Sequence, residues 1–546
     1  MQPIAATSSQ TSTAIPVLLR RGGCLLMLAV AVAAPFAGVE LGALDPCDES
    51  YQTLCVASYS SQPAAPATFA AGNLWQNLFG HEALTLRYLG ALCVVASIAI
   101  GALWFYLRRG NALQACALML TASLTATPAI FRIYNWDTGA YPAEALALVC
   151  ALALWQRPRM WKSALLGALC AWLFLCRIQL IVCLPLTLWL ACAALRRDRL
   201  KCAAVTLGAF CLAWLALSVL IFGTPCGHIE AIASGNFITG HTPASWRYIL
   251  WRAWADALDL PLAWLPLSAA ICCGIVWQKY TPHCVRLRIF LCAVLSGWIF
   301  LVAAVSVSFY DGIIFAADLP LFIAIALLPW LLRRPYVPRV AILICVVSVL
   351  LTAFGSDAIA ERYFSCYALA PLVAAVLPSM GRGGRRMLWS IVVFAAFAGG
   401  CTTFMRYREM ARINTHPMDG FPLQKGLAGS DRDLMYWSAV SHEIDMRRGR
   451  RIKFVCRHYG LTLSYGAEIS DCNELNRFHF FDGDLSPLCD GTGALTYDTY
   501  IFTLAKPESY PLMVKEFKEA GYTLAPSTEA SCNGEYFILE LPSEND

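Results

Sequence analysis

Long apolar stretches alternate with short polar ones along the first 404 residues of the chain. Several stretches are shorter than the roughly 20 residues that a helix needs to cross a bilayer upright, so we expect tilt or local thinning. The alternation predicts an all-α polytopic membrane protein with about 13 transmembrane helices. The predicted spans are 22–43, 86–107, 112–131, 140–155, 163–176, 178–195, 202–222, 262–278, 288–309, 312–332, 339–354, 364–380 and 387–404.

Positive charge between the spans predicts their orientation. Every second loop is rich in Lys and Arg, starting with Arg20 and Arg21 before the first span. Because basic loops stay in the cytoplasm, we predict a cytoplasmic tail at 1–21 and outer loops at 44–85, 132–139 and 223–261. The alternation depends on Arg177, since one long span at 163–195 would invert everything downstream. The predicted location is a plasma membrane, the inner membrane in a bacterium.

Residues 405–546 have a different character from the transmembrane domain at 22–404. They hold 15 Lys and Arg against 21 Asp and Glu, which leaves 26 against 15 in the rest of the chain. Their patterns predict a small extracytoplasmic α/β domain, either a structural cap or a module that docks the acceptor. The predicted helices are 432–448 and 511–520, and the predicted strands are 452–456, 478–481, 500–504 and 536–541.

Composition excludes several classes of protein. The chain is 58% hydrophobic and 14% charged, whereas soluble domains have about 45–50% and about 25%. Disordered, collagen-like and purely soluble enzymes are therefore excluded. The basic excess lies in short loops, which suits control of topology and not nucleic-acid binding.

Most of the 24 cysteines lie inside apolar runs, where a thiol behaves as a small hydrophobic group. The first outer loop has two cysteines and the tail has four, and these even numbers permit disulfides without defining their pairing. These six are Cys47, Cys55, Cys456, Cys472, Cys489 and Cys532.

Ionisable residues in or beside the predicted spans lie near one face of the membrane. Each of them is within roughly 10 Å of the outer surface at 1.5 Å per helical residue. A transporter would place such groups near the midplane in two related halves, so this depth favours a site open to the outer face. The residues are Glu40, Glu144, Arg177, Asp318 and Arg362.

The first two outer loops carry the candidate chemistry. Asp48 and Glu49 are adjacent acids just after the first span, as expected if one acts as a base or holds a cation while the other orients the site. The alternative is that acids simply accumulate in outer loops. The second loop adds Asp137 directly after Trp136 and close to Tyr134, although aromatic residues at an interface are usually anchors.

The motif Asp48-Glu49-x-Tyr51 resembles the Asp-Glu motif of GT-C glycosyltransferases, in the branch with protein O-mannosyltransferases and the lipid A aminoarabinose transferase. The span number and outer tail are similar to that transferase, and the family's Lys-Pro-Pro is Gln62-Pro63-Ala64 here. Further residues similar to family landmarks are Pro63-Ala64-Ala65-Pro66, Leu78-Phe79-Gly80, Arg87, Asp137, Glu361-Arg362-Tyr363-Phe364 and Pro371.

The resemblance implies an inverting transfer of a sugar from a polyprenyl-phosphate donor to a lipid, glycan or protein acceptor at the outer face. Nucleotide sugars are cytoplasmic, so an outward-facing enzyme needs a donor carried by the membrane. Asp48 would be the general base, and Glu49 and Asp137 would orient the acceptor or bind a cation. The resemblance makes no cofactor certain, and a divalent metal remains an alternative.

Cations would stabilise the departing phosphate as its charge builds. Arg362 is the first candidate, with Arg247 and Arg252 as supplementary ones. Tyr51, Gln62 and His241 are candidates for contact with sugar or acceptor, and His228 for an assisting role, although lone loop histidines are usually solvated. Two other hypotheses remain, a transporter or flippase for a lipid-linked sugar and a non-catalytic envelope protein.

Overall fold

The chain is described here from a computed structural model. The structure describes residues 11–45, 48–127, 134–234, 368–447, 449–455, 485, 488–489, 494–503, 507–525 and 536–542. The spans predicted at 262–278, 288–309, 312–332 and 339–354 lie outside these residues, and so do the strand predicted at 478–481, Arg247, Arg252, His241, Asp318 and Arg362.

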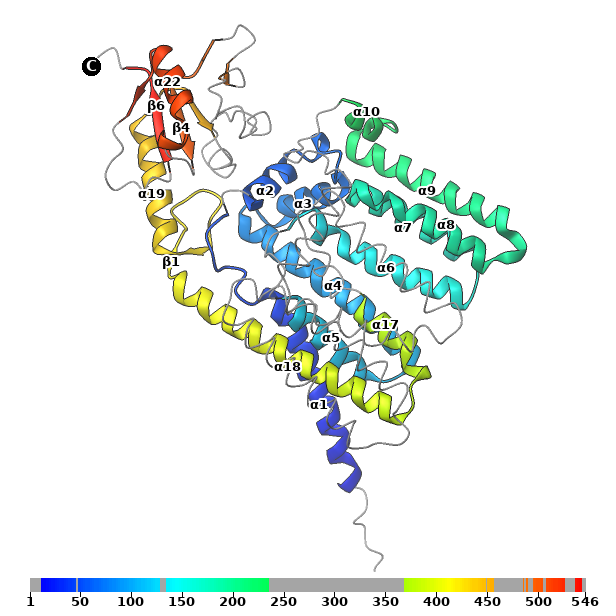
Figure 1. The fold of residues 1–546 in the computed structure, drawn as a ribbon. Coiled ribbons are helices and arrows are strands. Elements are labelled where there is room, and N and C mark those ends of the chain that lie inside the picture. The colour runs from blue at the N-terminus through cyan, green and yellow to red at the C-terminus, as the bar shows by residue number, and fades with distance from the viewer. Residues whose placement is uncertain are drawn as a thin grey trace, which may run out of the picture.

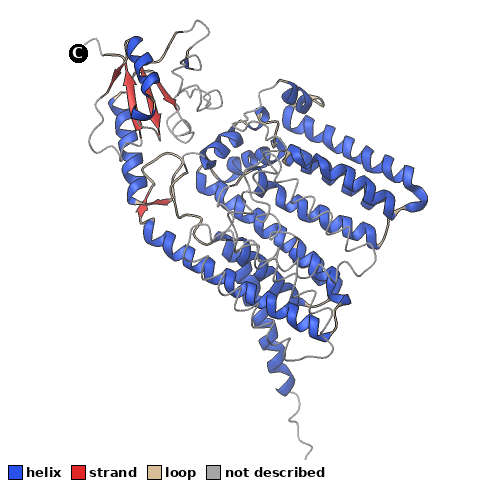
Figure 2. Ribbon diagram, in the orientation of Figure 1, coloured by secondary structure: helices blue, strands red, loops and turns tan. Residues whose placement is uncertain are grey.

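The described part of the first 413 residues is helical (Figure 2). Four of its helical stretches are long and apolar enough to cross a membrane, namely α4, α6, α18 and the stretch Arg196–Phe222 that contains α9, and shorter apolar helices accompany them. The protein is therefore an integral membrane protein. Its apolar helices are α1 (Thr11–Ala33), α4 (Ala83–Arg109), α5 (Ala112–Ala126), α6 (Trp136–Gln156), α7 (Met160–Cys176), α8 (Cys183–Ala194), α9 (Arg199–Phe222), α17 (Leu369–Val376) and α18 (Arg382–Ile413).

The ends of two helices, the first helix and α7, determine the path of the chain at the end of the bundle. The first helix ends at Ala33, well before residue 43 where the predicted span ended, because Pro35 follows in a short 3₁₀ turn and Gly38 has a φ of 68°. Glu40 therefore lies in the loop after the helix and not at the end of a span. At the second point α7 ends at Cys176, and Arg177 is extended, so 163–195 is not one helix.

The helices pack as neighbours in a bundle. In Figure 1, α7, α8 and α9 lie side by side, and α4 runs through the middle beside α6 and α5. Packing between α5 and α18 completes the described bundle, and α18 has 32 residues, about 48 Å at 1.5 Å each. That length exceeds a hydrocarbon core of about 30 Å, so α18 continues beyond the membrane toward the C-terminal residues.

Short helices cover one end of the bundle. They are α2 (Asp48–Ala57), α3 (Pro66–Phe79) and α10 (Gly227–Ala233), and all three lie at the same end in Figure 1. Helix α2 holds Asp48, Glu49 and Tyr51, and Gln62 lies between α2 and α3, so this end of the bundle is called the α2–α3 end below.

The residues after α18 form a small α/β unit. Its sheet has the strand order β3-β4-β6-β5, in which β3 and β4 are parallel and the other pairs are antiparallel. The strands are β3 (Ile452–Val455), β4 (Thr499–Thr503), β5 (Thr523–Leu524) and β6 (Tyr536–Glu540), and the helices are α19 (Asp431–Met446) and α22 (Pro511–Glu519).

Alternating side chains give this sheet two buried faces. Tyr500 and Phe502 pack against α22 through Met513 and Phe517. On the opposite face, Ile501 packs with α19 in a cluster that also contains Trp437, Leu44 and Ala83. The last two residues belong to the membrane part, so one apolar core joins the sheet unit to the α2–α3 end.

Gly167 allows α7 and α9 to approach closely, because a Cβ atom there would overlap the backbone carbonyl of Thr206. We expect Gly167→Ala to lower the free energy of unfolding by about 1–3 kcal/mol through overpacking. Gly208→Ala is the matched control on α9, where a Cβ meets nothing within 4 Å. Thermal unfolding in detergent measures both variants, and equal stability of the two would contradict the close approach.

Candidate functional site

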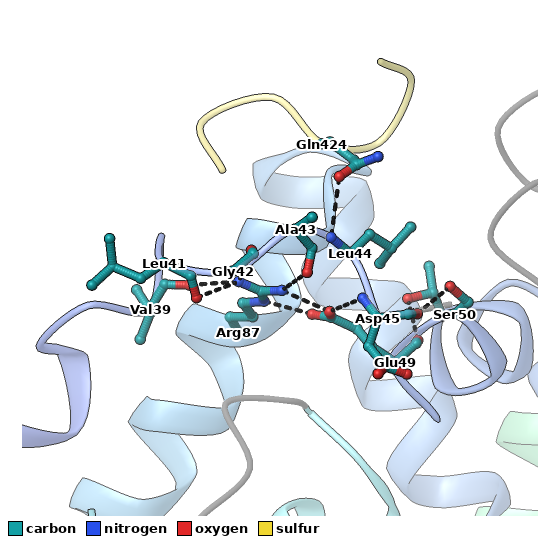
Figure 3. Close-up of polar contacts among 11 residues, drawn as sticks. Val39, Leu41, Gly42, Ala43, Leu44, Asp45, Glu49, Ser50, Arg87 and Gln424 are labelled. Atoms are coloured by element: carbon teal, nitrogen blue, oxygen red, sulfur yellow. Dashed lines mark hydrogen bonds and ion pairs between the residues drawn. The ribbon is translucent and has the colours of Figure 1, made fainter. Parts of the chain in front are cut away.

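Arg87, one turn into α4, binds the loop that leads from the first helix to α2 (Figure 3). Its Nε donates to Glu49 Oε1 at 2.6 Å, and its Nη2 donates to Glu49 Oε2 at 2.7 Å. The remaining donors reach four backbone carbonyl oxygens, those of Val39 at 3.0 Å, Leu41 at 3.4 Å, Gly42 at 2.9 Å and Ala43 at 3.0 Å. A single guanidinium thus binds a carboxylate in two places and a run of carbonyls.

This ion pair is buried, since Arg87 is 4% exposed and Glu49 is 3% exposed. Removing two charges from water costs several kcal/mol per ion, and the cost is offset only when geometry and hydrogen bonding are complete. Arginine has five N–H donors in a planar fork, and here they all have acceptors within reach. Lysine could not do the same, because it has three donors and no fork.

Glu49 also holds the start of α2. Its Oε2 accepts from the Asp45 backbone N–H at 3.1 Å, while Ser50 donates to the Asp45 carbonyl through its N–H at 3.2 Å and its Oγ at 2.6 Å. Both carboxylate oxygens of Glu49 are therefore engaged. Asp48 is the first residue of α2, next to this fixed carboxylate.

A second network fixes the turn that contains Gln62, Pro63 and Ala64. The Ala64 carbonyl accepts from Ile178 N–H at 2.9 Å, just past the break between α7 and α8. The turn thus lies against the chain around Arg177. Gln62 itself is buried, and its Nε2 has no hydrogen-bond partner in the described part of the chain.

His228 holds the same turn from α10. Its Nδ1 accepts from Trp214 Nε1 at 3.2 Å, so in the neutral ring Nε2 carries the proton and donates to the Pro63 carbonyl at 2.9 Å. Burial lowers the pKa of His228 below its ordinary value, and the bond to Pro63 acts in the opposite sense. The expectation that loop histidines are solvated is wrong for His228, because the ring is fully buried between aromatic side chains.

Asp137 lies in the first turn of α6. The helix has a capping box, in which Asn135 Oδ1 accepts from Asp137 N–H at 3.0 Å and from Thr138 N–H at 2.9 Å, and Thr138 Oγ1 accepts from Asn135 N–H. Asp137 forms a buried ion pair with Arg177 Nη1. A negative side chain at a helix N-terminus is also favoured by the helix dipole.

Glu144 is two turns further along α6, on the face of Asp137. It is buried, and its Oε2 has no hydrogen-bond partner in the part of the chain that the structure describes. Two acids and one arginine therefore line this stretch between α6 and α7.

Aromatic contacts join the two loops. The rings of Tyr51 on α2 and Trp136 on α6 meet edge to face, with centroids 6.3 Å apart. Tyr134 packs beside them and donates from its hydroxyl to the Thr68 carbonyl at 2.7 Å. Asp48, Glu49, Tyr51, Gln62 and Asp137 are consequently gathered at the α2–α3 end.

Cys55 lies within the same aromatic and aliphatic cluster and carries a free thiol. Burial raises its pKa to about 12, so the group stays protonated and unreactive at neutral pH. The predicted possibility of a disulfide in the first loop is therefore not realised at Cys55.

Arginine partners are the part of the site that sequence analysis missed. Arg87 was identified only as a family landmark, and Arg177 only as a charge at a helix junction. An isolated arginine in an apolar stretch signals a buried acid partner, because an unpaired charge there is costly. The sequence contained that signal, but it could not say which acid each arginine would bind.

Metal ligands were the other open point. Among the side chains that the structure describes, no three His, Cys, Asp or Glu residues come together in a way that could hold a metal ion.

Comparison with known proteins gives the fold. The structure is similar to the crystal structure of the Archaeoglobus fulgidus oligosaccharyltransferase in complex with zinc and sulfate, with a TM-score of 0.50 and 13% identity over 96% of this chain and 74% of that chain. Two further solved structures are the same organism's AglB with an inhibitory peptide and a dolichol-phosphate (TM-score 0.49, 13% identity, 96% and 76% covered) and Cupriavidus metallidurans ArnT bound to undecaprenyl phosphate (TM-score 0.43, 13% identity, 96% and 98% covered). No protein-family model and no curated protein sequence matches the chain.

The chain therefore has the fold of that oligosaccharyltransferase, a polytopic membrane architecture of the kind that the first-loop resemblance predicted. At 13% identity this likeness extends to the architecture alone. The predicted total of about 13 spans stays a prediction, because four of those spans lie outside the described residues.

Arg87→Lys is expected to destabilise the protein by about 1–3 kcal/mol, because three donors without a fork cannot satisfy both Glu49 oxygens and all of the buried carbonyls. Thermal unfolding in detergent measures the loss. Arg412→Lys, at an exposed position in the last turn of α18, is the control and should leave stability unchanged. Wild-type stability in Arg87→Lys would show that the fork is not needed.

Proposed function

We propose that the protein is a membrane glycosyltransferase that moves a sugar from a polyprenyl-phosphate donor to an acceptor hydroxyl at the outer face of the membrane. The GT-C fold supports this class of reaction. The single observation that carries the residue assignment is the Arg87–Glu49 pair, because it occupies one acid of the Asp-Glu motif and leaves the base role to the other.

The reaction is a displacement at the anomeric carbon. The acceptor oxygen forms a bond to that carbon while the bond from the carbon to the phosphate oxygen breaks, and the stereochemistry inverts. Asp48 takes the hydroxyl proton, and polyprenyl phosphate leaves with the electron pair. Glu49 could take that proton only by weakening its pair with Arg87, so its role is to position the loop.

Asp137 has a similar positioning role in this proposal. Its pair with Arg177 fixes the N-terminus of α6, and Trp136 then packs against Tyr51 three residues beyond Asp48. Tyr51 and Gln62 are proposed to contact the sugar or the acceptor.

Arg362 is proposed to bind the donor phosphate, with Arg247 and Arg252 as supplementary cations. A preplaced guanidinium stabilises the charge that develops on the leaving phosphate more than it stabilises the ground state. The acceptor class is open between lipid, glycan and protein. Lipid and intact-mass analysis of cells with and without the gene would identify it, because a missing sugar on one envelope molecule gives donor and acceptor together.

Asp48→Asn is expected to lower the transfer rate by at least about 10²-fold, since the amide cannot accept the hydroxyl proton. Transfer of labelled sugar from a synthetic polyprenyl-phosphate donor measures the rate in reconstituted vesicles. Glu230→Gln removes an exposed carboxylate from α10 at the same end and is expected to retain wild-type turnover.

Retained turnover in Asp48→Asn, at normal expression, would remove Asp48 as the base. Sugar-lipid uptake into vesicles without any covalent product would instead favour a transporter or flippase.

Arg362→Ala is expected to lower kcat/KM for the donor by about 10²-fold or more while the protein still folds, because a phosphate-binding cation is lost from the transition state. Arg362→Lys keeps the positive charge without the planar fork of donors. Its kcat/KM for the donor should therefore lie between those of the wild type and Arg362→Ala. The assay varies donor concentration at fixed acceptor. Unaltered donor dependence in Arg362→Ala would overturn the phosphate-binding role.

A further inference from the structure

The hairpin His416–Gly429, closed by the pairing of β1 (His416–Pro417) with β2 (Ala428–Gly429), connects α18 to α19 and lies on the loop that Arg87 binds. Its backbone is held internally, since Met418 N–H donates to the Leu427 carbonyl at 2.9 Å and Leu427 N–H to the Gln424 carbonyl at 2.9 Å. The hairpin is therefore an ordered element and not a slack linker.

Three backbone contacts join this hairpin to the membrane part. Gly42 N–H donates to the Ala428 carbonyl at 2.8 Å, and Ala428 N–H donates to the Glu40 carbonyl at 2.9 Å. Ala83 N–H, the first amide of α4, donates to the Leu423 carbonyl at 2.9 Å.

Gln424 adds a side-chain bond, in which its Oε1 accepts from Leu44 N–H at 3.1 Å (Figure 3). Gln424 is 0% exposed and Leu44 is 1% exposed, so water does not substitute for this acceptor. Leu44 is four residues before Asp48.

The hairpin and Arg87 supply opposite halves of what the loop needs. Arginine only donates, so Arg87 satisfies carbonyls and leaves the amides of Gly42 and Leu44 without acceptors. Ala428 and Gln424 provide those acceptors, because a buried amide without one costs free energy. The loop before Asp48 is thus held between a membrane helix and a segment of the C-terminal unit.

The backbone of Leu423 is a second observation that contacts with the membrane part determine the conformation of the hairpin. Its φ is 63°, the left-handed region that residues with a Cβ rarely adopt, and the carbonyl it orients is the one that accepts from Ala83. Such a conformation persists only when the surrounding contacts over-determine it.

We propose that Gln424 is a positioning residue of the active site, through which the C-terminal unit fixes the loop that carries Asp48. The role rests on the proposed function, since it assigns Asp48 to the chemistry. Movement of α19, which follows the hairpin directly and packs on the sheet, would be passed to the loop. The C-terminal unit is then a part of the catalytic scaffold.

Gln424→Met tests this role, because it keeps the length of the side chain and removes the acceptor. We expect amide exchange in a peptide covering 39–45 to accelerate about tenfold, and exchange in α7 and α9 to stay the same. We also expect kcat to fall about tenfold with KM for the polyprenyl-phosphate donor within about twofold, because the base is displaced while donor contacts remain.

Lys425→Ala is the matched control, since Lys425 is the exposed neighbour in the same hairpin, and it should behave as wild type. Gln424→Glu, which keeps an oxygen at the accepting position, should restore part of the protection of 39–45. Unchanged exchange at 39–45 in Gln424→Met, or a rise in donor KM equal to the loss in kcat, would overturn the positioning role.

If the variants do not fold, hydrogen exchange in the wild-type protein tests the positioning role. Its Gly42 and Leu44 amides should exchange together with the hairpin amides, and exchange of the loop well before the hairpin would contradict the proposal. Hydrogen exchange requires no turnover, so absence of transfer in the wild type would defeat the proposed function while leaving the result on the loop intact.

Discussion

The guanidinium of Arg87 is the group on which the geometry of the α2–α3 end depends. It binds both oxygens of Glu49 and the carbonyls of a loop that would otherwise carry buried, unpaired acceptors. Because the first helix ends early, at Ala33, this loop is long and contains only the short 3₁₀ turn Ala34–Phe36 and an isolated bridge from Leu41 to Ala428. The donors of Arg87 bind backbone carbonyls that have no helical hydrogen bonds. The chain can therefore turn at the end of the bundle and start α2 at Asp48. A buried ion pair stabilises the fold only when its donors and acceptors are satisfied, because both charges have lost water. The N–H groups of Arg87 and both carboxylate oxygens of Glu49 have such partners.

A second arginine plays the corresponding role for the second loop. Arg177 is placed where α7 ends, and its pair with Asp137 ties that junction to the N-terminus of α6. The Tyr51–Trp136 contact then joins the two arginine-centred networks. Of the three candidate acids, Glu49 and Asp137 are thus paired with arginines. This is the arrangement expected of a site in which the third, Asp48, is the general base. The hairpin of the C-terminal unit completes the same arrangement from the opposite side, with acceptors where Arg87 can offer only donors.

The sequence predicted the helices well where apolar runs were bounded by charge or glycine, as at α4 and α9, and the amphipathic pattern predicted α19, α22 and strands β3, β4 and β6 to within a residue or two. It misplaced the end of the first helix, because apolar residues continue past Pro35 and hydropathy does not register a chain turn. The partners of Glu49 and Asp137 lie 38 and 40 residues away, and Gln424 lies 380 residues from Leu44. Local patterns contain no information on such pairings. They follow from helix packing and from the need to satisfy buried charge, which only the folded chain defines.

The most direct measurement of the central claim is a cryo-EM structure of the full chain in a lipid nanodisc with a polyprenyl phosphate bound. The account predicts that the Arg87 fork holds Glu49 and the carbonyls of residues 39 and 41–43, and that the phosphate lies in a cavity shared by Asp48 and Arg362. A phosphate separated from Asp48 by packed protein, or a loop released from Arg87 in the donor-bound state, would contradict it.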